Sequence, residues 1–154
     1  MISFSDLMTS EKGSVFSPVF ATLHATAFAE TARWTEDAFT QLFATPGTEA
    51  LLASVEEEPV GFILVRSVLD EAEILTLAVV PEWRRHGIAR KLLQRLEQEL
   101  DQKQVRKLFL EVSTTNTPAK KLYTSTGFIT AGIRKRYYED GSDAIVMARE
   151  ITKA

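Results

Sequence analysis

The sequence contains no cysteine, so the chain can form no disulfide, present no thiolate nucleophile and bind no zinc through sulfur. No apolar run approaches the roughly 20 residues that span a bilayer. Positive charge is not in excess, as it usually is in nucleic-acid-binding proteins, because 18 lysines and arginines stand against 21 acidic residues. The first residues, Met1 to Asp6, lack the basic and then apolar layout of a signal peptide. We therefore expect a soluble, cytoplasmic protein that contacts neither nucleic acid nor a membrane directly.

A length of 154 residues suits one domain, and no linker or repeat divides the chain, so we expect a single domain over residues 1–154. Apolar periodicity predicts an α/β (α+β) fold, with a mixed, mostly antiparallel central sheet of about six to seven strands flanked by about four helices. The expected helices are 17–30, a short one capped by Thr35, 88–102, and one opened by Thr117 and Pro118 that runs through Ser125. The expected strands are 49–55, 60–69, 73–80, a buried strand at 107–112, 128–138 and 144–150. Turns are expected at Glu57–Pro59 and Asp70–Glu71, and the strand–helix–strand order over 73–112 implies one parallel crossover.

A basic turn between a strand and a helix is the first candidate site. The apolar run at 74–80 ends at Pro81, the turn carries Arg84, Arg85, Gly87 and Arg90, and an amphipathic helix follows. This order aims a helix N-terminus and free backbone N–H groups at one place, which suits phosphate. The spacing is neither the dinucleotide fingerprint nor a Walker P-loop. The alternative is a basic helix start that faces solvent, and the position between strand and helix favours the phosphate site.

Glu111 and Tyr123 form the second candidate site. Glu111 stands near the end of an apolar strand, where a carboxylate can serve as a general base. Its alternative role is an ion pair with Lys107 or Arg106. Tyr123 lies in the following helix, and its alternative role is packing on the sheet.

Two histidines, far apart in the sequence, do not suggest a metal site, so no metal is expected. His24 falls on the apolar face of the first expected helix and is expected to be a core residue. His86 lies within the basic turn.

Several short pieces occur together in a characteristic order. They are Asp70-Glu71-Ala72, Leu77-Ala78-Val79-x-Pro81, Arg84-x-x-Gly87-x-Ala89-Arg90, Leu110-Glu111-Val112, Asn116-x-x-Ala119-x-x-Leu122-Tyr123, Gly127-Phe128, Tyr137-Tyr138 and Asp143-Ala144-x-x-Met147. In this order and spacing the chain resembles the GNAT superfamily of acetyl-CoA-dependent N-acetyltransferases. Within that superfamily it is most similar to the RimI-type ribosomal-protein-alanine N-acetyltransferases.

The resemblance implies a GNAT fold and a role for each matching position. The implied residues that bind acetyl-CoA are Leu77, Ala78, Val79, Arg84, Arg85, His86, Gly87, Ile88, Ala89, Arg90 and Asn116. In that set, the strand backbone would hold the pantetheine arm and the basic turn would hold the pyrophosphate. Glu111 would accept a proton, and Tyr123, with water as the alternative, would protonate the departing CoA thiolate. Trp34, Tyr137 and Tyr138 would line the acceptor groove.

The chain departs from the family pattern on the acceptor side. Arg33-Trp34-Thr35 stands where Pro-Trp-Ser is usual, and Ala89 replaces a more usual glycine on the donor side. The resemblance implies acetyl transfer to a protein N-terminus, that of an alanine in a small-subunit ribosomal protein, by direct attack in a ternary complex. The alternatives are acetylation of a small-molecule amine and a non-catalytic CoA-binding module.

Overall fold

The computed structural model describes residues 1–138 and 140–151. In this part of the chain, seven strands form one sheet in the order β1-β2-β3-β4-β5-β7-β6. The strands are β1 (Ile2–Phe4), β2 (Thr48–Val55), β3 (Glu58–Val68), β4 (Glu71–Val79), β5 (Lys107–Ser113), β6 (Ile129–Arg134) and β7 (Ala144–Glu150). All neighbours pair antiparallel except β4 and β5, which are parallel, so the expected fold class and crossover are confirmed.

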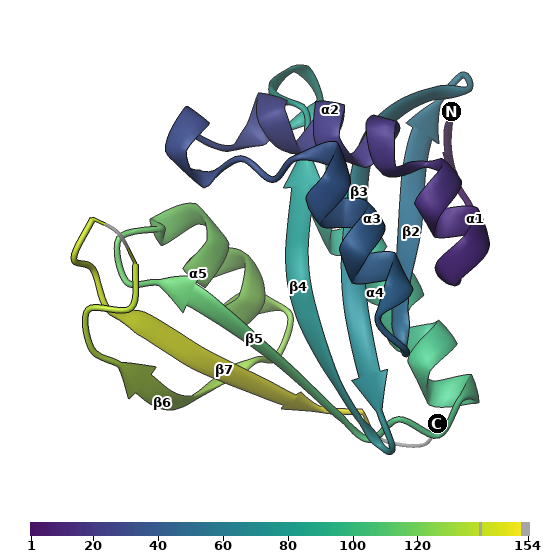
Figure 1. Ribbon diagram of the computed structural model, residues 1–154. Helices are drawn as coiled ribbons and strands as arrows, with labels where there is room; N and C mark the ends of the chain where they lie inside the picture. Colours follow the sequence, from purple (N-terminus) through teal and green to yellow (C-terminus); the bar gives the residue numbers. More distant parts are fainter. Residues whose placement is uncertain (139, 152–154) are drawn as a thin grey trace.

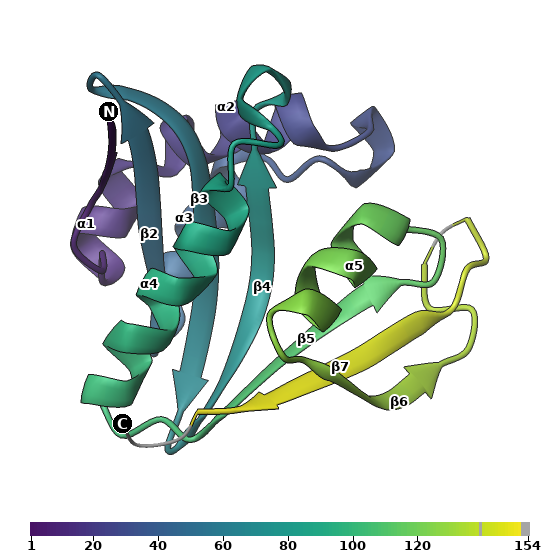
Figure 2. The ribbon, with the colours of Figure 1, turned by 180° about the vertical axis from the view of Figure 1, so that it is seen from behind.

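Helices cover both faces of the sheet (Figures 1 and 2). The helices α1 (Ser10–Val15), α2 (Ser17–Ala27) and α3 (Glu36–Ala44) lie over one face of β2 to β4. The opposite face carries α4 (Ile88–Gln102) and, over β5 and β7, α5 (Thr117–Ser125).

The two helical layers are held by different apolar groups. On the α1–α3 face, the ring of Phe20 lies 5.0 Å from that of Phe62 in β3 and 5.6 Å from that of Phe43 in α3, and all three rings are buried. On the other face, α4 buries the predicted stripe, which comprises Ile88, Leu92, Leu93, Leu96 and Leu100. Each fully buried Phe or Leu contributes about 1.5–3 kcal/mol, so these two layers hold the sheet between them.

The N-terminal third differs from the sequence-based expectation. The strand β1 and the helix α1 were not expected, and α2 ends at Ala27 rather than near Glu30. Phe28 is extended, at φ −123° and ψ 150°, and its ring stacks back on His24 with centroids 4.1 Å apart. A separate 3₁₀ turn at Glu30–Ala32 follows before α3. The prediction failed because no Gly or Pro marks the stop, and a side-chain contact sets it instead.

The hairpin turns also lie one residue or more from their expected places. The β2–β3 turn uses Glu56 and Glu57, at φ 49° and 71°. Pro59 lies inside β3, where it pairs with Ser54 beside a register shift between the two strands. The next turn begins at Leu69, at φ 58°, so β4 starts at Glu71. Glutamate and leucine rarely adopt positive φ, so the sequence gives little signal for these turns. The last hairpin pairs 129–134 with 144–150, and the expected strand at 128–138 is therefore shorter.

None of the helices within residues 1–138 and 140–151 is long and apolar enough to cross a bilayer.

Candidate active site

The strands β4 and β5 pair over a short stretch and then diverge. Glu71–Glu73 pairs with Lys107–Phe109, and no further β4–β5 pair occurs among the described residues. A register shift against β3 leaves Leu75 as an extra residue in β4, just where the two strands separate (Figure 1). Bulges bend the strand that carries them. The predicted residues Leu77, Ala78 and Val79 therefore lie beyond the last β5 pair, on an edge of β4 whose backbone groups can bind an extended ligand.

The basic turn ends as an open helix N-terminus. Gly87 adopts φ 75° as the N-cap of α4 and supplies no capping side chain. The first helical bond runs from Lys91 N–H to the Gly87 carbonyl, which leaves the N–H groups of Ile88, Ala89 and Arg90 without helical acceptors. No acidic residue lies in the first turn, and no atom of the described residues lies within 4 Å of the place where a Cβ on Gly87 would be. Free N–H groups, the positive end of the helix dipole and this space suit a phosphate group.

The polar side chains of the turn divide between structural contacts and exposure. Arg84 Nε donates to the Val79 carbonyl over 3.3 Å, which ties the turn to the end of β4. His86 Nδ1 lies 2.9 Å from the Arg84 carbonyl. Arg90 Nη2 donates to Ser125 Oγ over 2.8 Å and links α4 to α5. Arg85 is exposed and, at φ 66°, sits in the left-handed region. We therefore expect Arg85 and the helix N–H groups, more than Arg84 or His86, to meet an anion.

Asn116 caps α5, a role that the sequence assigned to Thr117. Its Oδ1 accepts the N–H of Ala119 over 3.2 Å, and Thr117 is the first helical residue. Asparagine is among the strongest N-cap residues, and Pro118 then fits the first turn. The cap uses the side-chain oxygen, so the amide NH₂ group can still donate to a ligand.

Glu111 lies on the face of β5 that turns away from α5. In the expected buried strand, Leu108, Leu110 and Val112 are buried and the alternate residues are half-buried, and α5 covers one face of β5 (Figure 2). Arg134 of β6 reaches over β7 and places Nε 3.2 Å from Glu111 Oε1. The Arg134 side chain is 57% exposed, which limits this pair to about 1 kcal/mol or less.

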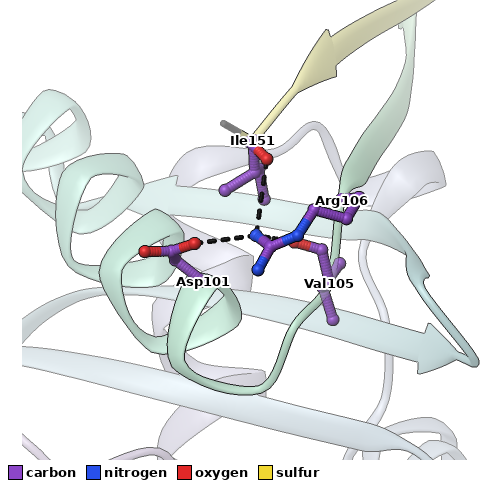
Figure 3. A network of polar contacts seen from close by, with 4 residues as sticks. All are labelled: Asp101, Val105, Arg106 and Ile151. Atoms are coloured by element: carbon purple, nitrogen blue, oxygen red, sulfur yellow. Dashed lines mark hydrogen bonds and ion pairs between the residues drawn. The ribbon is translucent and has the colours of Figure 1, made fainter. Parts of the chain in front are cut away.

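The alternative role for Glu111, an ion pair with Lys107 or Arg106, is not the one found, because Glu111 pairs with Arg134. Arg106 instead donates to Asp101 Oδ1 over 2.7 Å and to the Ile151 carbonyl over 3.4 Å, at the far end of β5 (Figure 3). Lys107 lies over the ring of Phe109, with Nζ 5.6 Å from its centroid. Strand alternation puts Lys107 on the Glu111 face but four residues away, and the sequence offered no signal for Arg134 because their proximity depends on the β5–β7–β6 register.

Tyr138 lies near enough to interact electrostatically with both Glu111 and Tyr123. Burial, with a smaller contribution from Tyr138, raises the pKa of Tyr123 to about 12, and the Tyr123 ring packs edge-on against Phe128. Burial also raises the pKa of Tyr138, and the negative charge of Glu111 adds to that shift. Tyr137 is exposed and packs edge-on against Tyr138, and Arg134 lies over the Tyr137 ring. Glu111, Tyr137 and Tyr138 thus lie in one neighbourhood with Arg134, which the sequence analysis missed, and Tyr123 is linked to this group through Tyr138.

Trp34 belongs to a different group of residues. It lies in the α2–α3 connection, half-buried against His24 and Phe39. That connection lies over the α1–α3 face, beside the end of β4 (Figure 1). No group of three or more residues that could hold a metal ion occurs among residues 1–138 and 140–151.

Comparison with known proteins identifies the family. The family model described as "Acetyltransferase (GNAT) family" matches residues 19–128. The chain belongs to this family. It is 44% identical over 95 residues to the [ribosomal protein bS18]-alanine N-acetyltransferase of Escherichia coli K12, a match that covers 60% of this chain and 64% of that protein, just under two thirds of its length.

A longer match to the Salmonella typhimurium protein of the same name is 37% identical over 124 residues and covers 77% of this chain and 82% of that protein. The crystal structure of the ribosomal-protein-S18-alanine N-acetyltransferase from Escherichia coli superimposes with a TM-score of 0.87 at 33% identity, covering 100% of this chain and 96% of that one. The GNAT fold predicted from the sequence is therefore confirmed.

Proposed function

We propose that this chain transfers the acetyl group of acetyl-CoA to the N-terminal α-amine of a protein, and that its natural acceptor is an alanine at the N-terminus of a small-subunit ribosomal protein. One observation carries the proposal. The strands β4 and β5 diverge, so that the basic turn, whose open helix N-terminus suits an anion, follows the end of β4, while Glu111 lies on β5 with Tyr138 near it. The names of the relatives, which act on alanine of ribosomal protein bS18, suggest the acceptor.

The donor side fits acetyl-CoA by its chemistry. The open N-terminus of α4 and exposed Arg85 supply N–H donors and positive charge for the pyrophosphate. The unpaired edge of β4 at Leu77–Val79 supplies backbone groups for the amides of the pantetheine arm. The Asn116 amide, which the helix cap leaves available, is a further donor at the start of α5.

The acceptor side fits an α-amine better than a lysine. The pKa of an N-terminal amine is roughly 8 and that of lysine about 10.4, a gap of about 2.4 units or on the order of 3 kcal/mol near neutral pH. Glu111 is a single carboxylate base that already pairs with a cation, Arg134, where an α-ammonium group would have to bind. The amine nitrogen bonds to the acetyl carbonyl carbon, its proton passes to Glu111, and the carbon–sulfur bond breaks. Since the chain has no cysteine, the transfer is direct.

Tyr123 supplies a hydrogen-bond donor for the leaving sulfur. With a pKa of about 12, its hydroxyl keeps its proton at every pH at which the enzyme would work. A thiol has a pKa of roughly 8.5, so complete transfer from Tyr123 would be uphill by about 3.5 units. We therefore assign Tyr123 the role of stabilising the developing thiolate, with water as the eventual proton source.

The test is a thiol-release assay with acetyl-CoA and a panel of acceptors. We expect turnover with Ala-initiated peptides and little with N-terminally blocked peptides, polyamines, aminoglycosides or free amino acids. Turnover with a small amine in place of any peptide would replace the proposed acceptor. Binding of CoA without transfer to any amine would show a non-catalytic module. Deletion of the gene, followed by mass spectrometry of protein N-termini, identifies the natural acceptor.

A further inference from the structure

His24 is a buried side chain that the proposed chemistry does not use. It lies near the end of α2 with 1% of its surface exposed. Its ring lies between two nearly parallel rings, those of Phe28 at 4.1 Å and 15° and Trp34 at 4.9 Å and 19°. Phe39 of α3 closes the group edge-on at 5.8 Å. Aromatic pairs at such separations contribute about 0.5–1.5 kcal/mol beyond the burial of their area.

One hydrogen bond distinguishes His24 from an ordinary core residue. The backbone N–H of Trp34 donates to His24 Nδ1 over 3.2 Å, across ten residues of chain. Nδ1 can accept this bond only in the neutral ring, which then carries its proton on Nε2. Burial lowers the pKa of His24 to about 4, so the ring is neutral at physiological pH and Nδ1 keeps its lone pair. A leucine or phenylalanine at this position would fill the space but could not accept the N–H.

Among the described contacts, the segment between α2 and α3, residues 28–35, is held by hydrogen bonds within itself and by ring contacts to α2 and α3. Within it, Ala32 N–H donates to the Ala29 carbonyl and Arg33 Nε donates to the Phe28 carbonyl over 3.1 Å. These bonds close the segment on itself. Near Trp34, the segment is attached to the rest of the protein by the stack on His24, by the contact of the Trp34 ring with Phe39 at 5.6 Å, and by the bond to His24 Nδ1. The segment projects beside the end of β4, on the face of the sheet to which Glu111 also turns (Figure 1).

We propose that His24 is a positioning residue for acetyl transfer: by stacking on Trp34 and accepting its N–H, it holds residues 28–35 where the incoming protein N-terminus binds. This rests on the proposed function, because it assumes that Trp34 faces a peptide acceptor. His24 would affect the binding of the acceptor and not the acetyl-transfer step. It is buried, and it would act on the acceptor only through Trp34.

Two substitutions separate the two contacts of His24. His24→Phe keeps the stack and loses the acceptor, whereas His24→Asn keeps an acceptor, because Asn Oδ1 can occupy the place of Nδ1, and loses the stack. The control is Leu23→Ala on the same helix, which removes a buried side chain but changes neither partner of the His24–Trp34 hydrogen bond. We expect His24→Phe to raise the peptide KM about tenfold with kcat and the acetyl-CoA Kd nearly unchanged. His24→Asn should recover part of that loss, and Leu23→Ala should lower Tm with an unchanged KM.

A second measurement needs no acceptor. In a Trp83→Phe background, Trp34 is the remaining tryptophan, and acrylamide quenching reports how tightly it is held. His24→Phe should increase quenching and Leu23→Ala should not. A wild-type peptide KM in His24→Phe, or equal quenching in His24→Phe and Leu23→Ala, overturns the proposal. If no peptide is acetylated by the wild-type protein, the proposed function fails, and the quenching result alone then decides whether His24 holds the segment.

Discussion

The turn at residues 84–90 and the segment at residues 28–35 lie at the same end of β4, yet they are held by different kinds of contact (Figures 1 and 2). The turn presents backbone N–H groups, and its form follows from Pro81, Gly87 and the helix that starts at Ile88, all close in sequence. The segment is held by side chains, through the stack of Phe28, His24 and Trp34 and the N–H bond to His24.

This difference matches the two ligands that we assign. A pyrophosphate is the same in every turnover, so a fixed arrangement of backbone donors can bind it. An acceptor N-terminus is recognised by its side chains, which calls for a surface that substitutions can reshape. We therefore expect variants of the turn to change donor affinity and variants around Trp34 and Glu111 to change acceptor use.

The strongest test of this separation is Glu111→Gln. Loss of a general base should lower kcat by about 10³-fold at pH 6.5, with the acetyl-CoA Kd unchanged. The deficit should shrink toward pH 9, where an amine with a pKa of roughly 8 is already deprotonated. Initial rates from pH 6 to 9 measure this, with Glu150→Gln, an exposed carboxylate on β7, as the control. A deficit independent of pH would remove the base role.

Acidification should lower the free energy of unfolding, because His24 must take up a proton. The folded pKa of about 4 lies below the ordinary 6.5, so between these values the unfolded state binds more protons. The free energy of unfolding should therefore fall as pH drops from 6.5 to 4, by up to about 3 kcal/mol, and this loss should level off below 4. Urea denaturation at steps of pH measures the slope. His24→Phe should flatten it, and an unchanged slope in that variant would assign the effect to other groups.

Tyr123→Phe should lower kcat by about 10²-fold and leave the acetyl-CoA Kd unchanged, because it removes one hydrogen-bond donor from the leaving sulfur. Since the pKa of Tyr123 is about 12, the wild-type rate should show no decline from its ionisation up to pH 10. Steady-state kinetics with calorimetric CoA titration separate the two effects. A weaker Kd with an unchanged kcat would make Tyr123 a binding residue.

Gly87→Ala tests the donor side alone. The variant should lose about 1 kcal/mol of stability from its positive φ and raise the acetyl-CoA Kd about tenfold, because the new methyl group occupies the phosphate space. The matched control is Gly141→Ala, which has φ 83° and equally open surroundings in the β6–β7 turn. It should cost the same stability without changing Kd. A Kd change shared by both variants would contradict a phosphate site at Gly87.

Arg134→Gln should have the smallest effect. Because the pair with Glu111 is largely exposed, its removal should change kcat/KM for a peptide less than about fivefold. Steady-state kinetics at two salt concentrations provide the measurement. A loss as large as that of Glu111→Gln would place Arg134 in the chemistry.

The strand, turn and helix of the donor side could be predicted from sequence because their signals are local. The helix at Ile88–Gln102 and its apolar stripe occur as expected, and so does the parallel crossover that follows β4. Errors fall where a contact between distant residues decides the structure. The early stop of α2 depends on the Phe28–His24 stack, and the partner of Glu111 depends on a register shared by three strands. The cap of α5 shifted by one residue because Asn116 and Thr117 are both good caps, and Asn116 is the one used.

The most direct test of the account is where the acetyl group goes on a single acceptor. A peptide with a free N-terminal alanine and one internal lysine is incubated with acetyl-CoA and the protein, and tandem mass spectrometry locates the modification. The account predicts acetylation of the α-amine and an unmodified lysine. Acetylation of the lysine, or no acetylation of the peptide at all, would contradict it.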